Sequence, residues 1–415
     1  MFTLKQQLIM VLMRIFPLAT KFIFSVLIIK YYKLSEIGKY NNAIGYVSVL
    51  VFIIGLQFSY CTSRDLSSSN TQKKISIVTT QSFIFMLIYA VIAIPVYIFF
   101  DNRYGVGFAA LSFLVFSHFS LEIYKILYSI RKPVHAAFIY SLGNGFWTLP
   151  IMLLLVLGRY PSIENIIFTT ASFSFLSILL GVFFLFVELD GRNSFFFVDI
   201  KYARTCFVVC IPIMLSTVAY RGSELLGRFA LEFTDGLASV GVFSSYQVIA
   251  CSLLIMAESG IAVVSLPYLV DAYKKNSVLY SKLKIKVIRQ TLCLSIFGTF
   301  LSVILSKYFF KIIGRADLLN DIHNYYVIAF SYFFLSSAIP YSLFMYVQKK
   351  DKYTVFFNVS LSILNIIIVF VFVYYLKMGA LGASLSLLVW SVMQFFVKYY
   401  YVSVCCSNVS NVSEA

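Results

Sequence analysis

Charged side chains interrupt several long apolar segments of this sequence, where a charge costs free energy unless a ligand, water or a partner compensates it. Arg14 and Lys21 lie in the first such segment, seven residues apart and therefore on one face of a helix. At the centre of a bilayer they would together cost about 5 to 7 kcal/mol, against the roughly 4 to 8 kcal/mol that the apolar residues of this helix contribute to insertion. Either both side chains extend to the lipid headgroups or they line a hydrated cavity, and we expect the cavity.

A second charged stripe lies in a later apolar segment. Arg221, Glu224 and Arg228 follow the spacing i, i+3 and i+7, which again places them on one helical face. One carboxylate can neutralise only one of two guanidinium groups, so one positive charge remains. The alternative is an ion-pair ladder within the helix that has no role in binding.

The other charges inside apolar segments are Glu122 with Lys125, at the spacing of an ion pair, and Glu258, which has no partner nearby in the sequence. Five cations against three carboxylates leave about two positive charges, which an anionic ligand would balance. We therefore predict two sets of site residues. The substrate-binding set is Arg14, Lys21, Lys125, Arg221 and Arg228; the candidates for binding a coupling ion are Glu122, Glu224 and Glu258.

A sugar attached to a lipid diphosphate matches the chemistry of such a path. Guanidinium and ammonium groups bind phosphates, while Ser and Asn side chains replace the water around sugar hydroxyls. Tyr and Phe rings stack on sugar rings, but most of the 43 Phe and 30 Tyr residues must face lipid or pack between helices. The aromatic content therefore adds little to the prediction.

The elements that must position these charges are membrane-spanning helices. Of the 415 residues, 60% are hydrophobic and only 12% are charged, which excludes soluble enzymes and nucleic-acid-binding proteins. A helix needs roughly 20 apolar residues to cross a bilayer, and the sequence contains about twelve such segments. We place them at residues 7–29, 42–60, 77–100, 105–128, 136–157, 166–187, 205–227, 237–260, 290–310, 325–347, 354–375 and 379–402. The predicted fold is an all-α polytopic membrane protein.

The distribution of Lys and Arg predicts the orientation of these spans. With the N-terminus in the cytoplasm, about nineteen of them, Lys398 included, lie at inner loops and span ends, against roughly ten outside. Both termini are therefore expected in the cytoplasm. The largest polar stretch, residues 271–289, is strongly basic and too short for a catalytic domain. Without a GxxxxGK[ST] sequence, the chain is not expected to hydrolyse ATP, and its seven Cys and three His suggest neither a metal site nor a cofactor.

Weak internal similarity suggests two halves. A small-residue and Gly-aromatic segment surrounds Gly38, and a similar one surrounds Gly241, each next to an apolar segment. Either the chain is duplicated or short turns of this kind recur by chance. Duplication would give six spans per half, with residues 1–200 and 201–415 forming two helical bundles of the same orientation.

The segments LSEIGKY at residues 34–40, ELLGRF at 224–229, VGVF at 240–243 and GALGAS at 379–384 resemble the O-antigen (Wzx-type) polysaccharide flippases of the multidrug, oligosaccharidyl-lipid and polysaccharide exporter superfamily. The resemblance covers nearly the whole chain. It implies two six-helix bundles around a central cavity that opens alternately to each side of the bacterial inner membrane. The cargo would be undecaprenyl-diphosphate-linked oligosaccharide, moved from the cytoplasmic to the periplasmic leaflet.

The same resemblance implies membrane lipids, a coupling proton or sodium ion and a glycan polymerase as partners, with no nucleic acid. A drug or metabolite antiporter of the same superfamily is the main alternative, and it would need unpaired carboxylates to bind organic cations. A membrane-embedded polysaccharide polymerase or acyltransferase is the second alternative. It would need a sizeable outer loop or a His-based catalytic arrangement, and neither is evident in the sequence.

Overall fold

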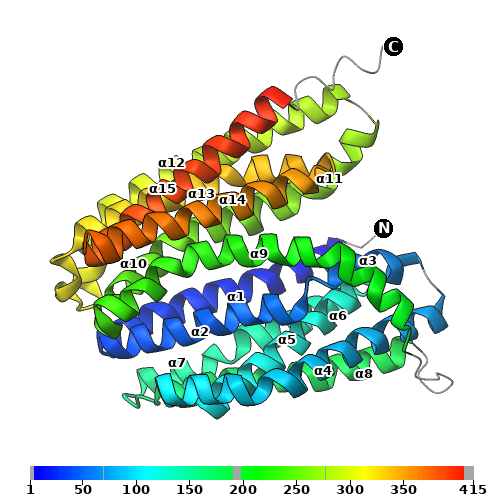
Figure 1. The fold of residues 1–415 in the computed structure, drawn as a ribbon, viewed down its shortest axis with the longest axis horizontal. Coiled ribbons are helices and arrows are strands. Elements are labelled where there is room, and N and C mark those ends of the chain that lie inside the picture. Colours follow the sequence, from blue (N-terminus) through cyan, green and yellow to red (C-terminus); the bar gives the residue numbers. More distant parts are fainter. Residues whose placement is uncertain (1–3, 69, 190–197, 276, 406–415) are drawn as a thin grey trace. The chain divides into compact units, whose positions relative to one another are not determined.

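A computed structural model describes residues 4–68, 70–189, 198–275 and 277–405, and every regular element within these ranges is helical (Figure 1). The α-helices are α1 (Leu4–Tyr31), α2 (Leu34–Gly55), α3 (Ser59–Ser68), α4 (Thr71–Tyr104), α5 (Gly107–Ser129), α6 (Pro133–Ser141), α7 (Thr148–Val156), α8 (Ile163–Glu188), α9 (Ile200–Thr234), α10 (Gly236–Met256), α11 (Val263–Lys275), α12 (Ser277–Ile312), α13 (Ile322–Val347), α14 (Asp351–Val369) and α15 (Gly379–Tyr400). Short π-helical segments are η1 (Leu142–Phe146), η3 (Ala257–Ala262), η5 (Phe370–Tyr375) and η6 (Tyr401–Cys405), and η4 (Ala316–Leu319) is a 3-10 helix.

Twelve helical stretches of the described residues are long and apolar enough to cross a membrane. Each overlaps one of the twelve predicted segments, which confirms the number of spans and the all-α, multi-pass fold. The orientation stays a prediction, and the chain ends at residues 1–3 and 406–415 lie outside the described residues.

The second span starts before residue 42, where the prediction placed it, and includes the polar segment of residues 34–41. Helix α2 begins at Leu34, so this polar segment is helical. The Glu36 carboxylate accepts a hydrogen bond from the backbone N–H of Lys33 (3.1 Å), which satisfies a free donor at the helix N-terminus. Polarity was a misleading signal here because helix termini favour polar residues as strongly as turns do.

The described chain forms two compact units. The first contains residues 1–31 and 39–218, and the second contains residues 32–38 and 219–415. The chain passes from one to the other within α9, 18 residues after the predicted boundary at residue 200. The first half of α9 packs in the first unit, where Tyr202 Oη donates to Asp65 (2.8 Å) and Cys210 Sγ lies 3.5 Å from Cys61 Sγ. Whether each unit moves as one bundle stays a prediction.

Each unit has a central helix that positions the polar side chains. In the first unit α5 packs against α8, α4, α6 and α3; in the second, α13 packs against α15, α10 and α12, which run side by side with it in Figure 1. Small residues permit these close contacts. Ser120 and Ser177 join α5 to α8 by a hydrogen bond of 2.6 Å, and Ser295 and Ser336 join α12 to α13 at 2.7 Å.

Residues 32–38 are held in the second unit by Arg315. Its Nη1 donates to the Tyr32 carbonyl oxygen (3.0 Å), while its Nη2 pairs with Asp317 (2.8 Å). The hydrogen bonds from Arg315 lower the pKa of the Asp317 carboxyl, so the pair stays charged at neutral pH. A short connection between spans is thereby fixed to a loop nearly 300 residues further along the chain.

Gly38 and Gly241, the two glycines of the similar segments, pack in the same contact of the second unit. A Cβ at Gly38 would overlap the Leu237 carbonyl oxygen, and one at Gly241 would overlap the Leu34 carbonyl oxygen. We expect Gly241→Ala to lower the free energy of unfolding by about 1 to 3 kcal/mol, because backbone must shift to admit the methyl group. Thermal unfolding in detergent measures this.

Gly222→Ala is the matched control for that substitution. Gly222 lies within α9, and a Cβ there would meet no atom within 4 Å. The control should be neutral or stabilise the chain by about 0.5 to 1 kcal/mol, since alanine favours a helix over glycine. Equal unfolding temperatures for the two variants would show that the close approach of α2 and α10 is not needed for stability.

Candidate functional site

Lys21 lines a polar cavity of the first unit. Its ammonium group donates to the Asn144 Oδ1 (3.3 Å), and Asn144 lies in η1, where the wider π-helical turn interrupts the fifth span. The cavity has a volume of about 200 Å³. Beside these two residues its lining includes Tyr40, Asn41, Ser117, Ser120, Trp147 and Thr170.

No carboxylate of the described chain pairs with Lys21, and none lines this cavity. Among the described residues, the acceptor that the Lys21 ammonium group contacts is the Asn144 amide oxygen. Such a lining can bind an anion at the ammonium group and hydrogen-bond hydroxyl groups of a sugar at the amides and serines.

Arg14 contacts a different part of the first unit. One guanidinium nitrogen lies 3.4 Å from Tyr124 Oη, and the guanidinium carbon lies 5.6 Å from the centre of the Tyr128 ring. Both tyrosines belong to α5, and Arg14 does not line the cavity that contains Lys21. The two cations share a helix face, as the spacing predicted, but the structure does not bring them to one cavity.

Glu122 and Lys125 form the ion pair that their spacing predicted, with 2.6 Å between Nζ and Oε1. The other oxygen of Glu122 accepts a hydrogen bond from Gln81 Nε2 (2.6 Å), so the buried carboxylate has partners on both oxygens. One turn earlier on α5, the buried His118 contacts Tyr89 Oη through Nδ1 (3.0 Å). Lys125 is thus already paired with a carboxylate in this structure.

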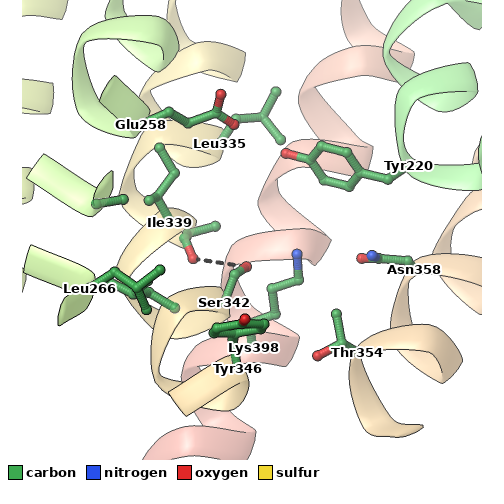
Figure 2. A pocket seen from close by; sticks show the side chains of 13 residues that line it. Tyr220, Glu258, Leu266, Leu335, Ile339, Ser342, Tyr346, Thr354, Asn358 and Lys398 are labelled. Carbon is green, nitrogen blue, oxygen red and sulfur yellow. Dashed lines mark hydrogen bonds between the residues drawn. The ribbon is translucent and has the colours of Figure 1, made fainter. Parts of the chain in front are cut away.

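A cavity of about 390 Å³ in the second unit contains both Glu258 and Lys398 (Figure 2). The ammonium group of Lys398 points into the space framed by Tyr220, Ser342 and Asn358, and its Nζ lies 5.1 Å from the centre of the Tyr220 ring. Lys398 is buried, with 4% of its surface exposed. The cavity therefore carries one buried positive charge and one carboxylate.

Lys398 was not among the predicted site residues, because it was counted with the cytoplasmic ends of the spans. In the structure Lys398 is buried within the helical stretch Gly379–Val404, and its place on the cytoplasmic side stays a prediction. A signal was present in the sequence, since Trp390, Gln394 and Lys398 recur every four residues and all three are buried on one face of α15.

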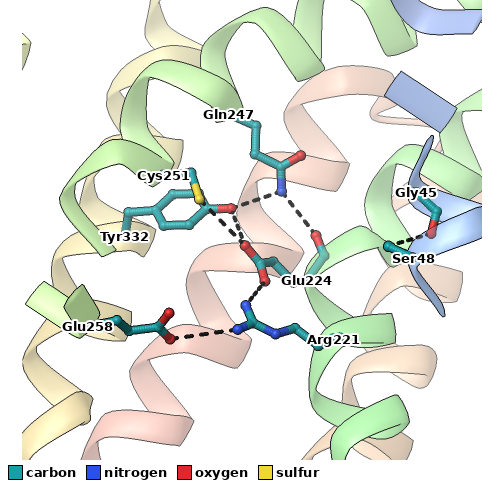
Figure 3. Close-up of polar contacts among 8 residues, drawn as sticks. All are labelled: Gly45, Ser48, Arg221, Glu224, Gln247, Cys251, Glu258 and Tyr332. Carbon is teal, nitrogen blue, oxygen red and sulfur yellow. Dashed lines mark hydrogen bonds and ion pairs between the residues drawn. The ribbon is translucent and has the colours of Figure 1, made fainter. Parts of the chain in front are cut away.

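Glu224 is the centre of a buried hydrogen-bond network in the same unit (Figure 3). Tyr332 Oη donates to its Oε1 (2.7 Å), and Arg221 Nη1 donates to its Oε2 (3.3 Å). Gln247 Nε2 donates both to Tyr332 Oη (3.0 Å) and to the Glu224 carbonyl oxygen (3.1 Å). This arrangement fixes the position of the Glu224 side chain, and it joins α9 to α10 and α13.

Arg221 also faces Glu258, with 3.8 Å between Nη2 and Oε1. Glu258 lies in η3 and Arg221 lies in α9, so the two partners are distant in the sequence. Arg228, the third member of the predicted stripe, is buried and does not line the cavity in Figure 2. The structure thus places two carboxylates beside Arg221, whereas the spacing of the stripe offered it only Glu224.

No family model matches the chain. It is 22% identical over 407 residues to the capsular polysaccharide biosynthesis protein CapF of Staphylococcus aureus, covering 92% of this chain and 94% of that protein.

The lipid II flippase MurJ in an inward closed conformation has a TM-score of 0.72 and 17% identity, with 96% and 88% of the two chains covered. A MOP-superfamily transporter from Pyrococcus furiosus has a TM-score of 0.68 and 12% identity, with 98% of this chain and 96% of that chain covered. An inward-facing multidrug resistance MATE transporter has a TM-score of 0.67 and 11% identity, with 94% of this chain and 95% of that chain covered. The predicted resemblance is therefore confirmed: the chain has the fold of the MOP-superfamily transporters and of the lipid II flippase MurJ.

Proposed function

We propose that this membrane transporter flips undecaprenyl-diphosphate-linked oligosaccharide, an O-antigen or similar repeat unit, from the cytoplasmic to the periplasmic leaflet by alternating access. The proposal places it in the bacterial inner membrane with both termini in the cytoplasm. The observation that carries it is the ammonium group of Lys21, which lines a polar cavity with no carboxylate beside it. The similarity to CapF and the fold shared with MurJ support a lipid-linked saccharide as the cargo.

The positions of the carboxylates favour this cargo over an organic cation. Glu122 pairs with Lys125, and Glu224 and Glu258 both face Arg221. A cation antiporter would need a carboxylate free to bind its substrate, whereas the three predicted carboxylates of this chain all have a basic partner. The drug or metabolite antiporter remains the second candidate because MATE transporters have the same fold.

If transport is coupled to a proton or sodium ion, Glu258 is the best placed of the three carboxylates. It lines the cavity of the second unit, and 41% of its side chain is exposed. Glu122 and Glu224 are nearly buried and have short hydrogen bonds to neutral partners as well as to a cation. A glycan polymerase as a partner stays a prediction.

We expect Lys398→Met to reduce flipping of lipid-linked oligosaccharide about 10-fold or more, because it removes the buried cation from the cavity of the second unit while keeping the length of the side chain. Lys398→Arg should retain partial activity, since charge matters more than geometry in a wide cavity. Initial flipping rates in vesicles measure both. A Lys398→Met variant as fast as the unchanged chain would exclude a role for this charge.

The proposed function is tested by reconstituting the purified chain in vesicles that contain fluorescent undecaprenyl-diphosphate-linked saccharide. We expect protein-dependent transfer of the saccharide between leaflets, and no uptake of a fluorescent organic cation such as ethidium. Ethidium transport without saccharide transfer would support the antiporter instead.

A further inference from the structure

A groove lies between α11 and α12 in the second unit, and it shares no lining residue with the cavity in Figure 2. It has a volume of about 500 Å³ and will be called the α11–α12 groove. Its lining is mostly apolar, from Val264 and Tyr268 on α11 to Leu283 and Val287 on α12, and Lys286 and Gln290 supply its polar groups on α12. A groove with an apolar wall and a cation suits an amphipathic ligand.

Exposed positive charges extend along α12 beside this groove. Lys282, Lys286 and Arg289 follow the spacing i, i+4 and i+7, so they share a helix face, and all three are exposed. None of them forms an ion pair with a carboxylate in the described part of the chain. Residues 271–289 contain six Lys and Arg but a single acidic residue, Asp271. The groove therefore has a strongly positive rim.

The length of α12 places this rim at the membrane surface. The helix has 36 residues, about 54 Å, whereas the hydrocarbon core of a bilayer is about 30 Å thick. Most of its exposed apolar side chains, among them Phe297 and Phe300, lie in the C-terminal half, although Ile285 is exposed too. Residues 282–289 precede most of them, so we expect the positive rim at the headgroup level and the apolar wall of the groove within the core.

We propose that the α11–α12 groove binds an anionic phospholipid of the surrounding bilayer. The phosphate would interact with Lys286 and its neighbours Lys282 and Arg289, and an acyl chain would lie along Val264 and the exposed backbone at Gly260. The preference for positive charge in cytoplasmic loops explains basic residues at this level, but it does not explain an apolar groove that begins at one of them. The inference holds whatever cargo the transporter carries.

The test is native mass spectrometry of the full-length chain released from vesicles with equal amounts of phosphatidylglycerol and phosphatidylcholine. We expect bound phosphatidylglycerol to be retained preferentially. The triple variant Lys282→Gln, Lys286→Gln and Arg289→Gln should weaken this retention roughly 100-fold, the product of an about fivefold loss for each charge near an anionic surface. Should the triple variant fail to fold, Lys286→Gln alone is expected to weaken it several-fold.

The control removes three charges from the same end of the unit but not from the groove. Lys349 and Lys350 lie at the turn between α13 and α14, and Lys352 lies in the first turn of α14. Gln348, next to them, hydrogen-bonds Tyr280 of α12 (3.2 Å). Changing these three lysines to Gln should leave phosphatidylglycerol retention unchanged. Equal losses in both triple variants would show a diffuse electrostatic attraction and overturn the proposal, as would the absence of any lipid preference in the unchanged chain.

A second variant tests the apolar part of the groove while keeping every charge. Gly260 lines the groove and a Cβ there would meet no atom within 4 Å, so we expect Gly260→Phe to be tolerated and its ring to occupy part of the groove. We expect it to reduce retention of phosphatidylglycerol about 10-fold but to leave binding of the soluble headgroup glycerophosphoglycerol unchanged. Full retention of the lipid in Gly260→Phe would contradict an acyl chain in the groove.

Discussion

Replacing Lys21 by alanine should reduce the initial rate of lipid-linked oligosaccharide flipping in vesicles about 10- to 100-fold, the effect of losing one charged hydrogen bond worth roughly 1.5 to 3 kcal/mol. The chain itself should be as stable as before or more stable. An ammonium group near the centre of a span costs about 2.5 to 3.5 kcal/mol of insertion free energy, and its only described hydrogen bond is to Asn144. Lost transport with unimpaired stability is the expected signature of a charge that serves binding.

The control for Lys21 lies on the same helix. Lys30→Ala removes an equal charge from an exposed position near the end of α1, and it should leave the flipping rate unchanged. Lys21→Arg should retain part of the activity because the positive charge is preserved. If Lys21→Ala flips lipid-linked oligosaccharide as fast as Lys30→Ala, the cavity of the first unit does not bind the cargo through its ammonium group.

Replacing Glu224 by alanine should lower the free energy of unfolding by about 1 to 3 kcal/mol, the cost of leaving the buried Tyr332 hydroxyl without its acceptor. Tyr332 and Arg221 would lose the carboxylate that accepts their hydrogen bonds, and the side chain of Glu224 is only 9% exposed. Tyr332→Phe, which removes one hydrogen bond from the network, should cost about 1 to 2 kcal/mol. Denaturant unfolding in detergent, followed by circular dichroism, measures both.

Glu258→Ala provides the comparison for Glu224→Ala. It also removes a carboxylate that faces Arg221, but that carboxylate is 41% exposed and lies 3.8 Å away. The expected loss of stability is at most about 1 kcal/mol. Similar losses for the two variants would show that the hydrogen-bond network around Glu224 does not stabilise the second unit.

The membrane-spanning architecture could be predicted from the sequence because span length and composition are local properties. Each of the twelve spans is a continuous, mostly apolar segment of the sequence, whichever helices it packs against. The ion pair Glu122–Lys125 could also be predicted, since the two side chains lie one turn apart on α5. Helix boundaries were harder to predict. Helix α2 begins eight residues before the predicted start of its span, and the prediction missed these residues because they are mostly polar.

The partners of the intramembrane charges depend on which helices pack together, and one sequence does not contain that information. Asn144 faces Lys21 across 123 positions of the chain, and Glu258 faces Arg221 from η3. Lys398 shows the same limit, because an ammonium group six residues before the end of its span fits a membrane interface and a buried cavity equally well. Only the packing of α15 against α13 distinguishes the two.

The central claim is that Lys21 receives a phosphate of the cargo, and photocrosslinking tests it most directly. A benzophenone side chain at Ser117, which lines the same cavity, is illuminated in vesicles that contain fluorescent undecaprenyl-diphosphate-linked saccharide. We predict a fluorescent adduct that disappears when Lys21 is changed to alanine and persists when Lys30 is changed. An adduct of equal yield in the Lys21→Ala chain, or no adduct from a chain that flips the saccharide, would contradict the claim.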